Sequence, residues 1–325
     1  MRIAALFFAL WIGMASGFAQ ASLAKLPRVS INGHDYIRIS DWCSANKYEA
    51  RVVGKEHVEV TGQNLRLRFS VNSQRAEING VGVSLSLPAA PRNGSLHLAP
   101  LDFQMAIQPI IFPKKTAAHV RTICIDAGHG GKDPGNLDGK NQEKKLTLTL
   151  AEELSALLKD AGFKAILTRT TDRFIELPGR PEIANRNRAD LFVSLHFNSA
   201  PVKNVSGIEV YCLTPAGASS SNSRGEGATS RNFPGNLQNE KNVLLAYQLQ
   251  KSLMKNLGTE DRGVHRARFS VLRDAKMPAV LIEGGFMSNP VESKKLYSSS
   301  YRQEMARAIL NGIQNYKKIV EQTEN

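Results

Sequence analysis

Four residues that can ligate a metal or move a proton stand beside apolar segments of strand or helix character. His129 lies among glycines in CIDAGHGGKDPGN (124–136), directly after an apolar run. Glu143 begins a long amphipathic segment, and His196 and Glu283 lie at the ends of LFVSLH and AVLIEGG. Two neutral imidazoles and one carboxylate form the three-ligand set of catalytic zinc sites, which leave a fourth position for water. Zinc lowers the pKa of such a water to about 7, so that Glu283 would accept its proton.

Each of these residues also has an ordinary structural interpretation. A histidine at a strand end is often exposed or hydrogen-bonded, and a glutamate at a helix start complements the helix dipole. No short H-x-x-x-H spacing fixes their geometry. A common site is favoured because α/β folds gather reacting groups at the carboxyl edge of the sheet.

The segments that must position these residues alternate between strand and helix patterns from residue 120 onward. This alternation predicts an α/β domain over residues 120–325. The expected strands are 121–127, 163–169, 191–196, 207–213 and 279–285, and the expected helices are 144–163, 180–188, 242–258 and 301–320.

The N-terminal part has a different texture. Short alternating runs such as HVEVTG, LRLRFSVNS and RAEINGVGVSLSLP, with Asn-Gly turns, predict antiparallel hairpins. We therefore expect a small β-rich α+β accessory domain over residues 22–112 and a linker over 113–119. The first of these regions resembles the copper amine oxidase N-terminal-like domain, which implies no copper. It is interpreted as a wall-binding or positioning module, and alternatively as a structural cap.

Residues 1–21 have the layout of a secretory signal. Arg2 precedes an apolar stretch, and Ala19-Gln20-Ala21 provides a small-x-small cleavage site. Export is expected, with no stable membrane span after signal removal; an uncleaved anchor is the alternative. Without Arg2 the net charge of +13 becomes +12, which for an exported protein indicates a polyanionic envelope surface or simple solubility rather than nucleic acid.

The cysteines do not define a disulfide framework. Cys43, Cys124 and Cys212 are few and widely spaced. Cys124 and Cys212 sit in apolar segments, where a thiol packs as a small hydrophobe. One disulfide is compatible with export, and the sequence does not choose its pair.

A resemblance to a known family adds information that residue spacing alone does not give. CIDAGHGGKDPGN, QEKKLTL, SLHFNSA and RGVHRARFSVLRDAKMPAVLIEGGFMSN, in this order, resemble the zinc-dependent N-acetylmuramoyl-L-alanine amidases of bacteria over about residues 120–319. The resemblance implies one zinc ion held by His129, Glu143 and His196, with Glu283 as the catalytic glutamate. It implies a single mixed, largely parallel sheet flanked by helices. It also implies hydrolysis of the amide between the lactyl group of N-acetylmuramic acid and L-alanine of the stem peptide, in the periplasm or cell envelope.

Further expectations concern substrate contacts and regulation. Arg180, Asn198 and Arg266 are predicted to bind substrate, although capping and surface ion pairs are the alternative interpretations. Some members of the resembled family carry an inserted helix that covers the zinc until an activator removes it. The corresponding segment here, 214–238, is rich in Ser and Gly. It is therefore expected to be a mobile loop without a helical plug, and no activator protein is expected.

Two other functions stay open at this point. The chain is alternatively another zinc peptidase of the cell wall, cutting within the stem peptide. It is otherwise a non-catalytic wall-binding protein on the same scaffold. The presence of Glu143 and Glu283 argues against the non-catalytic interpretation.

Overall fold

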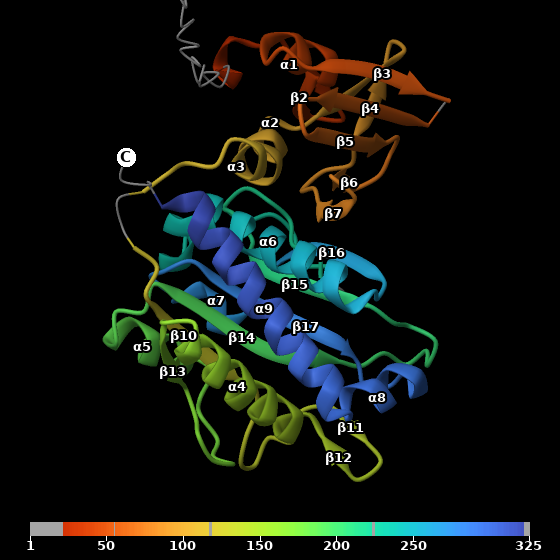
Figure 1. The fold of residues 1–325 in the computed structure, drawn as a ribbon. Helices are drawn as coiled ribbons and strands as arrows, with labels where there is room; N and C mark the ends of the chain where they lie inside the picture. Colours follow the sequence, from red (N-terminus) through yellow and green to blue (C-terminus); the bar gives the residue numbers. More distant parts are fainter. Residues whose placement is uncertain (1–21, 55, 117–118, 223–224, 322–325) are drawn as a thin grey trace, which may run out of the picture.

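A mixed β-sheet forms the centre of the C-terminal part (Figure 1) of the computed structural model, which describes residues 22–54, 56–116, 119–222 and 225–321. The expected signal peptide lies outside the described residues. Six strands follow the order β13-β10-β14-β17-β15-β16, and only the β15–β17 pair is antiparallel. The predicted mixed, largely parallel sheet is confirmed. The strands are β10 Thr122–Ala127, β13 Lys164–Leu167, β14 Leu191–Asn198, β15 Ile208–Leu213, β16 Asp261–Ala267 and β17 Ala279–Phe286.

Helices cover both faces of this sheet (Figure 1). The long helices α4, α6 and α9 pack over one face, on side chains such as Ile123 and Val193. The short helices α5 and α7 cover the other face, on Cys124 and Phe192. Neighbouring strand residues are thus buried on opposite sides, which explains their nearly continuous apolar runs. The helices are α4 Glu143–Asp160, α5 Gly179–Arg186, α6 Asn239–Leu257, α7 Ser270–Arg273, α8 Pro290–Leu296 and α9 Ser299–Val320.

The N-terminal part consists of hairpins, as the alternation predicts. One small sheet has the order β1-β2-β9-β8, while β3 to β7 form a meander of antiparallel neighbours. Trp42 of helix α1 stacks on Phe103 at 5.0 Å between ring centroids and closes the core. The elements are β1 Arg28–Ile31, β2 His34–Arg38, α1 Ile39–Ala45, β3 Glu49–Val53, β4 His57–Gly62, β5 Leu65–Ser70, β6 Arg75–Ile78, β7 Val81–Ser84, β8 Ala90–Arg92, β9 Ser95–Leu98, α2 Pro100–Asp102, a π-helical turn Phe103–Ile107 and α3 Gln108–Ile111.

The two parts share one sheet. Val83 of β7 pairs with Val264 of β16, so the meander extends the C-terminal sheet to eleven strands. Asp261 fixes this junction, because its Oδ2 accepts from Arg75 at 2.8 Å and from the Gly82 amide at 2.7 Å. One hydrophobic core runs through both parts. The division into an accessory domain, a linker and a catalytic domain stays a prediction.

Several elements escape the sequence patterns. They include β16, α7, α8 and the small hairpin of β11 Leu137–Asp138 and β12 Asn141–Gln142. The segment 214–238, expected to be a mobile loop, ends in a 3-10 turn over Pro234–Gln238. Among the described residues, no helix combines the length and hydropathy that crossing a bilayer requires.

Candidate active site

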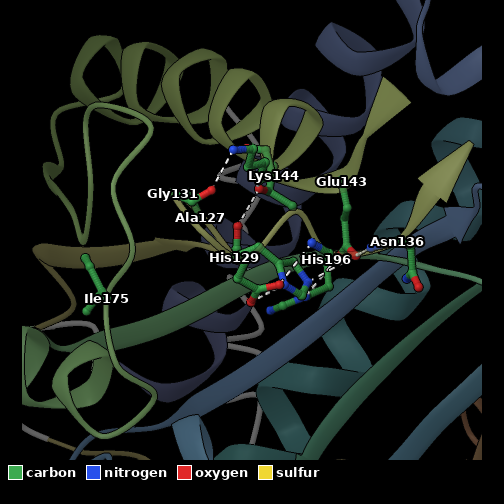
Figure 2. Close-up of polar contacts among 12 residues, drawn as sticks. Ala127, His129, Gly131, Asn136, Glu143, Lys144, Ile175 and His196 are labelled. Carbon is green, nitrogen blue, oxygen red and sulfur yellow. Dashed lines mark hydrogen bonds and ion pairs between the residues drawn. The ribbon is translucent and has the colours of Figure 1, made fainter. Parts of the chain in front are cut away.

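Three side chains predicted to hold a metal converge in space (Figure 2). Nε2 of His129 lies 3.0 Å from Oε2 of Glu143, and Nδ1 of His196 lies 3.0 Å from Oε1 of the same carboxylate. The two imidazole nitrogens are 3.1 Å apart, and the two rings stand nearly perpendicular. His129 follows β10, Glu143 opens α4 and His196 lies in β14. Three chain segments therefore direct one nitrogen, one carboxylate and another nitrogen at a common point.

Close backbone packing permits this convergence. His129 adopts a positive φ of 61°, a conformation that costs free energy in a residue other than glycine. At Gly128 a Cβ would lie 2.4 Å from Cε1 of His196, and at Gly135 it would lie 2.6 Å from Oε2 of Glu143. Both positions therefore require glycine, which explains their place in the motif around His129.

Hydrogen bonds orient the imidazole of His129 and the carboxylate of Glu143. Asp133 Oδ2 lies 2.8 Å from Nδ1 of His129 and accepts a hydrogen bond from it, which leaves Nε2 as the free ligand atom. The Glu143 carboxylate accepts hydrogen bonds from the backbone amides of Asn136 at 2.8 Å and Phe197 at 3.0 Å. Such outer partners fix ligand direction and are the usual companions of metal-binding histidines and carboxylates.

Charges within the cluster reinforce one another. Burial alone raises the pKa of Glu143, but the hydrogen bonds with His129 and His196 outweigh burial and hold this pKa well below its usual range. Burial likewise lowers the pKa of His129, and the contacts with Glu143 and Asp133 overcome it, raising the pKa above its ordinary value. The site is therefore built around a negative carboxylate that attracts positive charge.

Three buried cations hold the loop that carries His129. Arg169 donates to the carbonyls of Ala127 at 2.9 Å and Gly128 at 2.8 Å. Arg180 donates to the carbonyl of His129 at 2.9 Å, and Lys144 reaches that of Gly131 at 2.7 Å (Figure 2). Since carbonyl oxygens inside a protein need donors, these side chains fix the loop in its unusual conformation.

Glu283 lies beside the cluster. It pairs in register with His196 across β14 and β17, so the two side chains share one face of the sheet. Its Oε2 is buried and has no hydrogen-bond partner among the described residues. Burial raises the pKa of Glu283 well above its usual value, and the charges of Glu143 and Glu209 raise it further. Glu283 therefore differs from Glu143, whose two carboxylate oxygens both accept hydrogen bonds.

The three predicted substrate-binding residues are engaged within the protein. Arg180 is 1% exposed and pairs with Asp126 at 2.9 Å. Arg266 is buried and donates to the carbonyls of Leu213 and Met105. Asn198 donates to Glu209 at 2.7 Å. Arg180 and Arg266 thus hold the chain in position, and substrate binding by Arg180, Arg266 and Asn198 stays a prediction.

The segment 214–233 is tied to the neighbouring strand β16. The Ser221 amide donates to the Arg266 carbonyl at 2.9 Å, and the Ser221 hydroxyl lies 3.3 Å from Nδ1 of His265. The described residues of this segment, 214–222 and 225–233, contain no helix. Glu226 of this segment lines the cavity of about 700 Å³ that contains His129, Glu143, His196 and Glu283.

Sequence reasoning missed several members of the site. Asp133 lies inside the motif of His129, and its spacing of four residues offered a signal. Arg169 follows β13 by two residues and Asp126 lies near the end of β10, but nothing in the sequence indicated that they are buried. Glu209 stands in an apolar run, where a single acid is unusual and indicates a function.

The ligand set suits zinc. Two histidine nitrogens and one carboxylate oxygen, with an adjacent free carboxyl, make up the donor set of a zinc hydrolase. All three ligand atoms lie within 4.8 Å of one another. The outer partner Asp133 and the two required glycines are consistent with an ion at this point.

Comparison with known proteins identifies relatives of the C-terminal part. The family model described as N-acetylmuramoyl-L-alanine amidase matches residues 123–315. The chain is 34% identical to the N-acetylmuramoyl-L-alanine amidase AmiA of Salmonella typhimurium over 229 residues, which cover 62% of this chain and 78% of that protein.

Solved structures show the same likeness. The amidase AmiC2 of Nostoc punctiforme superposes with a TM-score of 0.52 and 34% identity, covering 62% of this chain and 99% of that one. The CwlD amidase of Clostridioides difficile, solved in complex with the GerS lipoprotein, has a TM-score of 0.51 and 29% identity, covering 61% of this chain and 99% of that one.

Proposed function

This chain belongs to the N-acetylmuramoyl-L-alanine amidase family and hydrolyses the amide that joins the glycan strand of peptidoglycan to the stem peptide, and we propose that it does so with one zinc ion. His129, Glu143 and His196 would hold the ion. The convergence of their three ligand atoms within 4.8 Å supports this assignment most strongly. The bond cleaved joins the lactyl group of N-acetylmuramic acid to L-alanine.

The residues of the chain divide the work of hydrolysis. Zinc, when bound, supplies a Lewis acid that polarises the carbonyl and acidifies water. Glu283 accepts the proton that water loses as its oxygen bonds to the carbonyl carbon. Glu283 then delivers this proton to the alanine nitrogen as the carbon–nitrogen bond breaks. Its Oε2 has no hydrogen-bond partner among the described residues, which supports a carboxyl that is free for both transfers.

Replacing Glu283 by alanine tests this division of roles. We expect turnover to be lost while one zinc per chain is retained, since Glu283 moves protons and does not hold the ion. His196→Ala should instead lose the zinc. Glu304→Ala, which changes an exposed glutamate of α9, is the matched control and should change neither property. Turnover by Glu283→Ala at the normal rate would refute the proposed role.

Product analysis tests the position of cleavage. Mass spectrometry of digested wall should show intact stem peptides with a free L-alanine amino group. Fragments cut within the stem peptide would instead identify a wall peptidase. Wall binding without any product would identify a non-catalytic wall protein.

The location and the regulation are also proposed. The signal-like residues 1–21 and the net charge support an exported enzyme of the periplasm or cell envelope. Residues 22–112, which resemble the copper amine oxidase N-terminal-like domain, are proposed as a wall-binding or positioning module. The absence of a helix from the described residues of 214–233 supports activity without an activator, although the CwlD relative was solved with a lipoprotein. Inactivity of the purified protein until a partner is added would contradict this.

A further inference from the structure

The cavity beside the metal ligands has a second wall with a different chemistry. Helix α7 packs against β15 and β17, and it contributes Val271 and Arg273 to the lining. Leu281, two residues from Glu283 on the same strand, also lines the cavity. Alternate residues of a strand share a face, and each residue advances the strand by about 3.3 Å. The cavity floor that Leu281 and Glu283 form is therefore about 7 Å long.

Most charges in this cavity already have partners. Asp133 pairs with His129, and Glu143 pairs with both histidines. Arg268 donates to the carbonyls of Ala218 at 2.6 Å and Gly227 at 2.9 Å, and it lies 3.9 Å from Glu226. These groups are therefore committed to the protein itself.

Among the cations that line the cavity, Arg273 is the exception. Its Nε is buried without a hydrogen-bond partner, and no acid of the described chain forms an ion pair with it. Its guanidinium lies over the ring of Phe233 at 5.4 Å from the centroid. An aromatic ring on one side restricts the orientation of a guanidinium and leaves its donors for a ligand.

The chemistry of the substrate matches this cation. A planar guanidinium binds carboxylates through paired hydrogen bonds. The residue that follows L-alanine in a stem peptide lies within about 7 Å of the scissile nitrogen along the chain, since each residue spans at most about 3.6 Å. This reach is comparable to the distance from Glu283 to Leu281 along the cavity floor, and Arg273 lines the same cavity.

We propose that Arg273 is a specificity-determining residue that binds a free carboxylate on the stem-peptide residue following L-alanine. The inference rests on the amidase function and deepens it, because it names the substrate class: stem peptides whose second residue is acidic rather than amidated. Arg273 then holds the peptide side of the scissile bond while Glu283 serves the nitrogen.

Two synthetic muramoyl peptides test the proposal. They are identical except that the second residue carries a carboxylate in one and a carboxamide in the other. The wild-type enzyme should cleave the carboxylate form with a kcat/KM about 10- to 100-fold higher, as expected for a hydrogen-bonded charge pair. Arg273→Gln should lose this preference by slowing on the carboxylate form alone. Arg273→Lys, which keeps the charge but not the fork, should fall between.

Arg231→Gln is the matched control. Arg231 also lies over Phe233, at 4.9 Å, but it is not among the residues that line the cavity. This variant should keep the full preference. Equal rates of the wild-type enzyme on both peptides, or an unchanged preference in Arg273→Gln, would overturn the role of Arg273 while leaving the amidase function intact.

A binding measurement separates the two failures. Calorimetry of both peptides with the zinc-loaded Glu283→Ala protein reports the preference without turnover. The carboxylate form should bind more tightly, and this difference should vanish when Arg273→Gln is added. Preference in binding with no cleavage by the parent enzyme would refute the amidase function alone. No preference in binding would refute the role of Arg273.

Discussion

Two arginines on helix α5 provide a test of what holds the His129 loop. Arg180 and Asp126 form an ion pair at 2.9 Å with side chains 2% and 0% exposed. Arg186 and Glu182 form an ion pair at 3.5 Å on the surface, with side chains 69% and 61% exposed. The substitutions Arg180→Met and Arg186→Met therefore remove the same group from the same helix in opposite environments.

The expected magnitude follows from the partners that remain. Without Arg180, Asp126 keeps only the hydroxyls of Thr168 and Ser194, each at 2.7 Å, while the carbonyl of His129 loses its donor. Removing one partner of a buried ion pair costs about 3–5 kcal/mol. An exposed pair contributes little, because water and salt screen it. Arg180→Met should thus lower the free energy of unfolding by about 3–5 kcal/mol, and Arg186→Met should leave it nearly unchanged.

Urea unfolding followed by circular dichroism measures both variants, with the midpoint shifting at constant slope. Zinc affinity gives a second readout, since the His129 carbonyl is released only in Arg180→Met. Equal stability of the two variants would refute the reasoning. A destabilised Arg180→Met that kept the zinc affinity of the wild-type protein would show that Arg180 supports the fold without positioning His129.

Three further predictions concern residues around the site and the N-terminal core. Asp133→Ala should weaken zinc binding about 10- to 100-fold in a chelator competition, because His129 loses its orienting acceptor; unchanged affinity would contradict this. Gly128→Ala should lower zinc content, since its Cβ would lie 2.4 Å from His196. Burial raises the pKa of Asp102 to about 6 from an ordinary 3.8. The Asp102 carboxyl therefore binds its proton more tightly in the folded state than in the unfolded state. This difference contributes about 3 kcal/mol to the free energy of unfolding below pH 3.8, and the contribution is lost as the pH rises through 6. Unfolding at several pH values should show this loss in the wild-type protein relative to Asp102→Asn; parallel curves would refute it.

The sequence predicts the C-terminal fold well because its signals are local. Apolar runs of strand length alternate with amphipathic segments, and the observed strands and long helices fall within a few residues of the expected ranges. The pairing of β7 with β16 has no such signal. Val83 and Val264 are far apart in the chain, and each stands in a short run that would also suit a free edge strand.

The site is predictable to the extent that strand ends determine it. His129 follows β10, His196 and Glu283 lie near the carboxyl ends of β14 and β17, and Glu143 begins a helix, so the α/β layout brings them to one edge. The sequence does not predict in the same way which charged side chains are buried. In the sequence Arg180 is a basic residue at the start of a predicted helix, yet its guanidinium is buried and forms an ion pair with Asp126. The residue types of a site were therefore easier to predict than their partners.

Two glutamates meet across strands β15 and β17, and their partners assign them different tasks. Glu209 and Glu283 are paired in register on one face of the sheet. Glu209 accepts from Asn198 at 2.7 Å, from the Tyr211 hydroxyl at 2.9 Å and from Arg262 at 3.0 Å, so its charge is fully compensated. Oε2 of Glu283 has no donor within the described chain. Burial, followed by the charges of Glu143 and Glu209, raises the pKa of Glu283 well above its usual value. Glu283 is therefore the carboxyl of this pair that we propose to exchange protons, while Asn198 is one of the donors that hold Glu209 in place.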